Sequence, residues 1–198
     1  MDNLLGGLER FDRVEVPLEG RRHAAVALAI SGADGGEDGS AVWLTRRAPR
    51  MRNHPGQFAL PGGGIDPGED AAGAAIRELG EEIGIAADRT QVLGLLDDYP
   101  TRSGYVITPV VLRVRDGQVP RVNPAEVSEL YRITFRELAV EPRFLTIPES
   151  ERPVIQLPLV GNFVHAPTAA VLYQFRELAL YGRVTRVDQL EQPVFAWK

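Results

Sequence analysis

A loop rich in glycine and proline, followed at once by a short helical segment, constrains this chain more than any other feature. The loop LPGGGIDPGED (60–70) contains four glycines and two prolines, a composition typical of a fixed backbone that can approach a ligand closely. The next residues, AAGAAIRELGEEIG (71–84), predict a compact helix from Ala71 to Ile83 that ends at Gly84. The chain must therefore place a glycine loop beside one short helix.

This helix has an apolar face and a neighbouring acidic face. At about 100° per residue, Glu78, Glu81 and Glu82 fall within an arc of about 100°. A second arc, roughly 120° away, comprises Ala72, Ala75, Ile76, Leu79 and Ile83. A solvated acidic face is one interpretation, although like charges at these spacings repel. The other is a site for a hard divalent cation such as Mg²⁺, which takes oxygen ligands and bridges to substrate phosphates.

Composition limits the classes of protein that remain. A chain of 198 residues that is 44% hydrophobic and 25% charged fits one soluble globular domain. The net charge of −5 argues against broad nucleic-acid binding, and without cysteine any metal must be bound by oxygen or histidine. Apolar runs are far shorter than the roughly 20 residues of a membrane span, and the acidic N-terminus does not resemble a signal peptide. We therefore expect a cytoplasmic protein without a membrane partner.

Strand and helix patterns are interleaved along the chain. Strands are predicted at 21–30, 41–45, 90–99 and 105–115, the first two flanking the long turn-rich tip of a hairpin. A helix is predicted at 168–182, with Thr168 as its N-cap and Gly182 as its stop. Between 120 and 151 the pattern is mixed and indicates a short helix or turn around NPAEVSELY. These elements predict a single α/β or α+β unit.

The glycine loop and acidic helix together match a known signature. They resemble the Nudix box, G-x5-E-x7-R-E-U-x-E-E-x-G-U, in which U is aliphatic. The seven fixed positions are Gly63, Glu69, Arg77, Glu78, Glu81, Glu82 and Gly84. A chance match at one starting position is rarer than about 10⁻⁸. The resemblance implies the Nudix fold, a mixed β-sheet sandwiched between α-helices, and hydrolysis of a nucleoside diphosphate linked to another group.

The resemblance also implies a metal centre. Glu78 and Glu82 would be the main ligands of Mg²⁺ or Mn²⁺, Glu81 a further ligand or the base that activates water, and the carbonyl of Gly62 an additional ligand. The metal would offset the charge of the diphosphate and lower the pKa of the attacking water.

Two more residues of the box would support this centre. By their positions in the box, Arg77 and Glu69 would brace the loop against the helix and so belong to the catalytic set. A surface ion pair of little energetic value is the alternative for this pair. The resemblance extends over about 22–182, which we expect to be the core of a single domain at 1–198.

The segment WLTRRAPRMRNHPGQFALPGG (43–63) indicates the substrate. It resembles the signature of the coenzyme A pyrophosphatase branch, L-L-T-x-R-(S/A)-x3-R-x3-G-x3-F-P-G-G, with Trp43 and Leu60 replacing the expected Leu and Phe. Its arginines lie next to the metal loop, and the planar guanidinium group suits the diphosphate and 3′-phosphate of coenzyme A. We expect Arg46, Arg47 and Arg52 to bind substrate, although a solvated basic loop is the alternative.

Three downstream segments bear on the same branch. TRSGYVITPVV (101–111) resembles it and adds Tyr105 as a candidate substrate-binding residue. NPAEVSEL (123–130) resembles a family segment whose glutamate approaches the metal, so Glu126 competes with Glu81 as the base, or is simply exposed at a helix start. His165 and Ala166 stand where the branch has Trp-Gly, which changes the expected pocket for the acyl side.

Three functions remain in competition. The first is a coenzyme A pyrophosphatase that releases 3′,5′-ADP and 4′-phosphopantetheine. The second is an ADP-ribose or nucleotide-sugar pyrophosphatase, which Pro100, sixteen residues after Gly84, weakly favours. The third is a non-catalytic Nudix-like binding module, for which a broken box would be typical. The sequence leaves the metal, the acyl-chain preference and the choice between monomer and homodimer open.

Overall fold

A mixed β-sheet forms the centre of the protein. The computed structural model describes residues 2–32 and 39–197. The strands of the central sheet are β1 (Arg22–Ser31), β2 (Ala41–Arg47), β3 (Phe58–Ala59), β4 (Gly62–Gly64), β5 (Val92–Leu95), β6 (Tyr99–Pro100), β7 (Tyr105–Arg113) and β8 (Val127–Thr134). The tip of the predicted β1–β2 hairpin lies largely outside the described residues.

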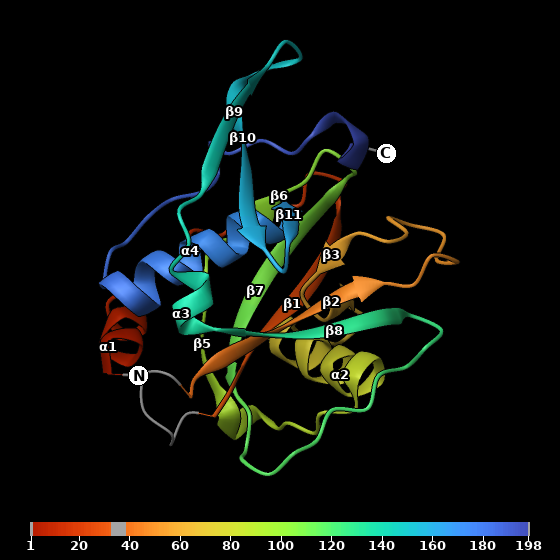
Figure 1. The fold of residues 1–198 in the computed structure, drawn as a ribbon, viewed down its shortest axis with the longest axis vertical. Coiled ribbons are helices and arrows are strands. Elements are labelled where there is room, and N and C mark those ends of the chain that lie inside the picture. The colour runs from red at the N-terminus through yellow and green to blue at the C-terminus, as the bar shows by residue number, and fades with distance from the viewer. Residues whose placement is uncertain (1, 33–38, 198) are drawn as a thin grey trace.

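Helices and a second sheet surround the central sheet (Figure 1). The helices are α1 (Asp2–Glu9), α2 (Ala71–Ile83), α3 (Phe135–Leu138) and α4 (Thr168–Tyr181), with 3-10 turns η1 (Arg89–Gln91) and η2 (Val194–Ala196). The second, antiparallel sheet comprises β9 (Arg143–Ile147), β10 (Ser150–Leu159) and β11 (Asn162–His165). Among the described helices, none has the length and apolar character needed to cross a membrane.

Strand β1 has a different partner along each half of one edge. Its other edge pairs in parallel with β7 from Arg22 to Ile30. Its second half pairs antiparallel with β2, where Ile30 lies opposite Val42. Its first half pairs antiparallel with β4, where Val26 lies opposite Gly62. The glycine loop is therefore hydrogen-bonded into the central sheet.

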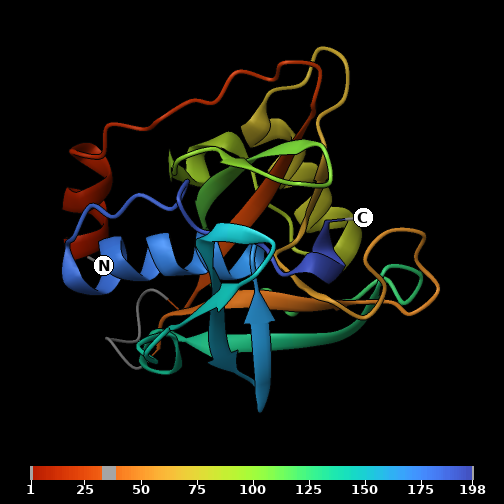
Figure 2. The same ribbon diagram turned by 90° about the horizontal axis from the view of Figure 1, so that it is seen from above.

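The sheet is covered on both faces, which explains why β1 is almost continuously apolar. Side chains alternate between the faces of a strand. Leu28 and Ile30 pack in one core cluster with residues of α4, whereas Ala27 and Ala29 pack in another with Leu79 of α2. Figures 1 and 2 show α2 and α4 on opposite sides of the sheet. The predicted mixed sheet between helices is confirmed.

Helix α2 begins and ends where the sequence predicts. The Asp70 side chain caps its start by accepting a hydrogen bond from the backbone N–H of Gly73 at 2.8 Å. Gly84 ends it in the left-handed conformation, with φ of 67°. Its buried surface differs from the predicted arc, because Ala74 and Glu82, on the glutamate side, are buried. The strands β1 and β4 cover that side, so the acidic face is not simply solvated.

Two of three other predictions need correction, whereas the one for NPAEVSELY is confirmed in its turn alternative. The strand expected at 90–99 is interrupted between β5 and β6, where Asp97 and Asp98 are buried and bonded to distant parts of the chain. The helix or turn expected at NPAEVSELY is a turn that leads directly into β8. Thr168 is not the N-cap of α4, since Pro167 holds that position and the Thr168 hydroxyl donates to the carbonyl of Phe58 instead.

Candidate active site

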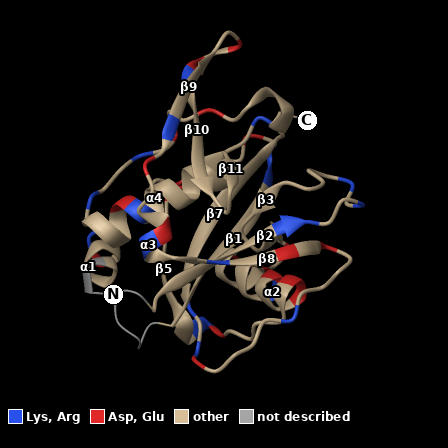
Figure 3. Ribbon diagram, viewed as in Figure 1, with Lys and Arg blue, Asp and Glu red and all other residues tan. Residues whose placement is uncertain are grey.

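Three carboxylates from two parts of the chain meet beside the glycine loop. One oxygen from each of Glu78, Glu82 and Glu126 can be chosen so that all three lie within 4.8 Å of one another. The backbone N–H of Asn123 donates to the carbonyl of Glu82 at 2.8 Å, and its side-chain amide donates to the Glu126 carboxylate at 3.3 Å. Asn123 therefore holds the turn before β8 against the end of α2. Figure 3 shows the acidic residues gathered on α2.

Burial makes this carboxylate group costly in the absence of a cation. Glu82 is only 3% exposed. The pKa of Glu82 is raised to about 8, mainly by burial and also by the charges of Glu78 and Glu126, against the opposing effect of Arg47. Burial also raises the pKa of Glu78, while Arg77 opposes that rise. A positive charge at this point would relieve the repulsion among the three groups.

The donor set of the group fits a hard divalent cation. All three side chains offer carboxylate oxygen, which Mg²⁺ and Mn²⁺ prefer to nitrogen or sulfur. Two of the three are on consecutive turns of α2, so their spacing is set by the helix. The pKa of Glu82 is raised mainly by burial and to a smaller extent by the neighbouring carboxylates, and a bound cation would oppose both effects by favouring the ionised form. The residues present therefore fit the metal that the sequence led us to expect.

Arg77 joins the glycine loop to the carboxylate group. It donates to both oxygens of Glu69, at 3.2 and 3.1 Å, and to the carbonyl of Gly64 at 2.9 Å. It also donates to Glu78 at 2.7 Å and to Glu81 at 3.3 Å. Hydrogen bonding to Arg77 is the main cause that holds the pKa of Glu69 below its ordinary value. One guanidinium thus binds three glutamates and one loop carbonyl.

The loop glycines are required by close packing. A side chain at Gly63 would overlap the carboxylate of Glu78, and one at Gly62 would overlap the carbonyl of Ala25 in β1. A side chain at Gly64 would meet no atom within 4 Å. Gly62 and Gly63 therefore allow the loop to lie against both the sheet and the acidic helix.

Glu81 lies apart from the three-carboxylate group. Its side chain is 54% exposed and pairs with Arg77 at 3.3 Å. The group within 4.8 Å contains Glu126 in its place. Glu126 was predicted only as an alternative base, and its proximity to Glu78 and Glu82 depends on the turn at Asn123.

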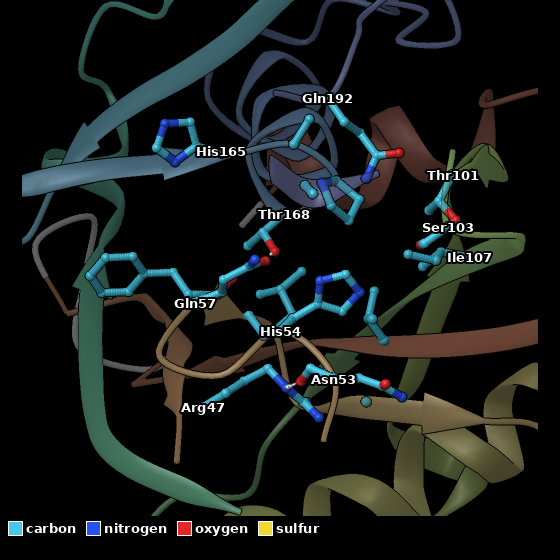
Figure 4. Close-up of a pocket in the computed structure, with 18 of the residues that line it drawn as sticks. Arg47, Asn53, His54, Gln57, Thr101, Ser103, Ile107, His165, Thr168 and Gln192 are labelled. Carbon is cyan, nitrogen blue, oxygen red and sulfur yellow. Dashed lines mark hydrogen bonds between the residues drawn. The ribbon is translucent and has the colours of Figure 1, made fainter. Parts of the chain in front are cut away.

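A cavity of about 420 Å³ adjoins the glycine loop. Gly62, Arg46, Arg47 and Tyr105 all line it, and Figure 4 shows Arg47 beside Asn53 at its edge. The size is within the usual range for small-molecule sites. The cavity therefore brings three of the four predicted substrate-binding residues to one space.

The four predicted substrate-binding residues differ in their surroundings. Arg47 lies with its Nη1 atom 3.8 Å from Glu82 Oε1, between the cavity and the carboxylates. Arg46 donates to Glu129 at 2.8 Å and to the carbonyl of Gly56 at 3.1 Å. Tyr105 has the guanidinium of Arg22 over its ring, 3.9 Å from the centroid. Arg52 is exposed on the loop after β2 and is outside the described cavity lining.

Other cavity residues were not found from the sequence. Gln192, Phe195 and Ala196 come from the C-terminal end of the chain, which has no recognisable pattern. Phe163 and His165 come from β11, and their strand was not predicted. The only signal in this region was the replacement of Trp-Gly by His165 and Ala166.

Sequence comparison gives a consistent family match. The NUDIX domain family matches residues 21–157. A protein of Pectobacterium atrosepticum named "Uncharacterized Nudix hydrolase NudL" is 31% identical over 163 residues, which cover 80% of this chain and 83% of that protein. A protein of the same name from Photorhabdus laumondii is 38% identical over 120 residues, covering 60% and 62%. "Nudix hydrolase 3" of Caenorhabditis elegans is 35% identical over 122 residues, covering 60% and 50%.

These matches differ in how much of each relative they include. For the Photorhabdus and Caenorhabditis proteins, this chain spans 62% and 50% of the relative's length. Among solved structures, a Nudix hydrolase from M. smegmatis called RenU aligns with a TM-score of 0.53 at 22% identity, over 84% of this chain and 91% of that chain. A MutT/nudix family protein from Enterococcus faecalis aligns with a TM-score of 0.57 at 12% identity, over 87% and 66%. The structural matches show a shared fold.

Proposed function

Because this chain belongs to the NUDIX domain family, we propose that it is a metal-dependent pyrophosphatase that cleaves the diphosphate of coenzyme A or its derivatives. The products would be 3′,5′-ADP and 4′-phosphopantetheine. The observation that carries the proposal is that a group of three carboxylates, of which Glu82 is buried, meets an arginine-lined cavity at Arg47.

Glu78, Glu82 and Glu126 would hold the Mg²⁺ or Mn²⁺ ion. The ion would supply the positive charge that binds and polarises a diphosphate. Gly62, at the boundary between cavity and carboxylates, presents backbone rather than side chain toward this space. The carboxylates repel one another without the ion, so their close approach is consistent with a site built for a cation.

The other residues of the site would position the groups that react. Arg77 holds Glu78 and Glu81 on one guanidinium, which fixes both carboxylates relative to the loop. Arg47 presents its charge to the cavity, where it would bind an oxygen of the diphosphate. Glu81, which lies outside the three-carboxylate group, would accept the proton of the attacking water, or Glu126 would do so if Glu78 and Glu82 hold the ion without it. The exposure of Glu81 leaves it accessible to solvent, whereas Glu126 belongs to the carboxylate group.

The substrate proposal rests on phosphate-binding groups and on the cavity beside them. Arg46 and Arg47 line the cavity, and Arg50 and Arg52 lie on the exposed loop that follows them. Coenzyme A carries a diphosphate and a separate 3′-phosphate. The diphosphate would pair with the arginines of the cavity, and the 3′-phosphate with those of the exposed loop. The apolar part of the cavity would receive the pantetheine arm.

A substrate panel tests this proposal. We expect the protein to hydrolyse coenzyme A with Mg²⁺ or Mn²⁺, to lose activity in excess chelator, and to act less well on ADP-ribose and dinucleoside polyphosphates. Phosphorus NMR would identify the two products. Preferential cleavage of ADP-ribose would refute the coenzyme A assignment and leave diphosphate hydrolysis standing, while no cleavage of any compound would favour a binding module.

A pair of variants tests the site itself. Glu82→Gln should reduce turnover by several orders of magnitude while the protein stays folded, because it removes charge from the cation site and relieves repulsion in the metal-free helix. Glu149→Gln, in the exposed turn between β9 and β10, is the matched control and should behave as wild type. Near-normal turnover of Glu82→Gln would remove Glu82 from the essential ligands.

A further inference from the structure

The C-terminal segment forms one side of the cavity. In Figure 4, Gln192 and His165 lie across the cavity from Arg47 and Asn53. Arg47 is the residue that reaches toward Glu82. Gln192 and His165 therefore mark the side away from the carboxylates, where the group attached to the diphosphate would lie.

This segment is fastened to the rest of the fold. The backbone N–H of Glu191 donates to the carbonyl of Pro153 at 2.8 Å, and the Glu191 carboxylate pairs with Arg102 at 2.6 Å. The backbone N–H of Arg102 donates to Gln192 Oε1 at 2.7 Å. The indole N–H of Trp197 donates to the carbonyl of Gln192 at 2.9 Å. These bonds make the segment a wall of the cavity.

Residues of β11, α4 and the connection between them extend this wall, and the combined surface is largely apolar. It includes Phe163, Ala166, Val171, Phe195 and Ala196. The ring of Phe195 packs edge-on against that of His165, with centroids 5.1 Å apart and planes at 83°. Burial lowers the pKa of His165, which favours its neutral form near pH 7.

Several polar side-chain atoms on this side already have protein partners. Thr168 donates to the carbonyl of Phe58 at 3.1 Å, and His165 Nε2 lies 2.9 Å from Gln156 Nε2. Gln192 Oε1 is occupied by a backbone N–H, as described above. A nucleobase needs free donors and acceptors along its edge to be recognised, whereas an uncharged aliphatic chain needs only apolar contact. The wall therefore suits an uncharged aliphatic chain of a substrate better than a nucleobase.

The charged residues of the cavity lie elsewhere. Within the described part of the chain, the lining residues with a formal charge are Arg46 and Arg47, both at the end of β2. No carboxylate or ammonium group of the described lining faces the C-terminal wall. A second phosphate or a charged sugar substituent would find no counter-charge there.

We propose that Phe195, packed against His165, sets the length of the uncharged chain that the cavity accepts beyond the diphosphate. The inference rests on the proposed function, because that chain is then the pantetheine arm together with any acyl group on its sulfur. Because Phe195 packs against His165, on the side of the cavity away from Arg47, long acyl chains would contact its ring and shorter ones would not. Phe195 is on this basis a specificity-determining residue that takes no part in the chemical step.

Acyl-chain selectivity of two Phe195 variants tests the inference. We would measure kcat/KM for coenzyme A, butanoyl-coenzyme A and dodecanoyl-coenzyme A with wild type, Phe195→Ala and Phe195→Leu. In the wild-type protein, kcat/KM should fall as the acyl chain of the substrate lengthens. Phe195→Ala should raise the ratio of dodecanoyl-coenzyme A to coenzyme A by roughly tenfold or more. Phe195→Leu should give an intermediate ratio.

A control variant isolates the effect of the wall. Phe144→Ala removes another exposed phenylalanine, which packs edge-on against Tyr173 and is outside the described cavity lining. It should keep the wild-type length profile. Melting temperatures of all variants would show whether either substitution disturbs the fold.

Each contrary result has a separate meaning. An unchanged length profile in Phe195→Ala, with coenzyme A still cleaved, overturns the inference and leaves the proposed function standing. Equal losses on all three substrates together with a lower melting temperature overturn it too, because they mark a structural role. Weaker inhibition of Phe195→Ala by 3′,5′-ADP, with the length profile unchanged, would assign this wall to the adenosine. If wild type cleaves ADP-ribose and not coenzyme A, the substrate proposal and the inference both fail.

Discussion

The Nη1 atom of Arg47 lies 3.8 Å from Oε1 of Glu82, so one side chain connects the cavity wall to the buried carboxylate of α2. Arg47 comes from β2 and Glu82 from the last turn of α2. Under the proposed function, a diphosphate held by the metal would lie beside the guanidinium of Arg47. This position separates Arg47 from Arg52, which is exposed on the following loop.

The two arginines should therefore affect different phosphates. We expect Arg47→Ala to lower kcat/KM about ten- to a hundredfold on both coenzyme A and 3′-dephospho-coenzyme A, as is usual for a lost charged hydrogen bond. Arg52→Ala should reduce coenzyme A turnover only a few-fold, since an exposed ion pair is weak, and should leave the dephospho substrate unaffected. Steady-state kinetics would decide. A loss in Arg47→Ala limited to coenzyme A would instead place the 3′-phosphate beside the carboxylates.

Two adjacent glycines should respond differently to the same substitution. Gly63→Ala would push the new methyl group into the carboxylate of Glu78, so we expect a large loss of activity and weaker metal binding. Gly64→Ala meets no atom within 4 Å and keeps the carbonyl that accepts from Arg77, so it should be nearly neutral. Activity against Mn²⁺ concentration would compare the two variants. Equal behaviour would show that contact with Glu78 is unimportant.

The stability of the metal-free protein should fall as the pH rises. The pKa of Glu82 is about 8 in the folded protein, above its ordinary value of 4.5, so its protonated form stabilises the fold. That contribution is complete below pH 4.5 and is lost as the pH passes 8. Ionisation of Glu82 should lower the free energy of unfolding by at most about 1.4 kcal/mol per pH unit.

Denaturant unfolding in excess chelator at several pH values would measure this slope. Glu82→Gln should flatten it, because glutamine does not ionise, and should make the metal-free protein more stable than wild type near pH 8. Glu149→Gln should keep the wild-type slope, since its side chain is exposed. If Glu82→Gln followed the wild-type curve, the carboxylate would be better solvated than its burial indicates.

Glu126 and Glu81 can be separated by metal affinity. If Glu126 is a ligand, Glu126→Gln should weaken Mn²⁺ binding by roughly tenfold or more, since even indirect partners of a metal typically contribute that much. Glu81→Gln should leave Mn²⁺ affinity close to wild type, because Glu81 lies outside the carboxylate group. Calorimetric titration of each variant with Mn²⁺ would measure both affinities, whether or not the variant is active. The reverse pattern would exchange the two roles.

The acidic helix was predictable because its causes are local. Asp70 supplies its N-terminal cap and Gly84 its left-handed end, and both effects depend only on neighbouring residues. The strand β1 was predictable for a similar reason, since a sheet covered on both faces needs a continuous apolar run. The family signature added the glutamates that gather on one side of the helix.

The remaining features depend on distant partners. Asp97 interrupts the strand predicted at 90–99 because it accepts hydrogen bonds from Val14 and Gln174, far away in sequence. Glu126 joins the carboxylate group through Asn123 and the backbone of Glu82. The C-terminal wall depends on bonds to Arg102 and Pro153. No local pattern encodes these contacts, so the sequence alone could not reveal them.

The pairing of the glycine loop with the first half of β1 has a consequence for local opening. The carbonyl of Pro61 accepts from the N–H of Ala27 at 2.7 Å, and the N–H of Ile65 donates to the carbonyl of His23 at 3.1 Å, so both ends of the loop strand are bonded to the core. A glycine-rich surface loop would ordinarily exchange its amide protons quickly. Here the loop can open only by breaking its backbone bonds to β1, a central strand of the sheet, so its bonded amides should exchange much more slowly than those of an unpaired loop.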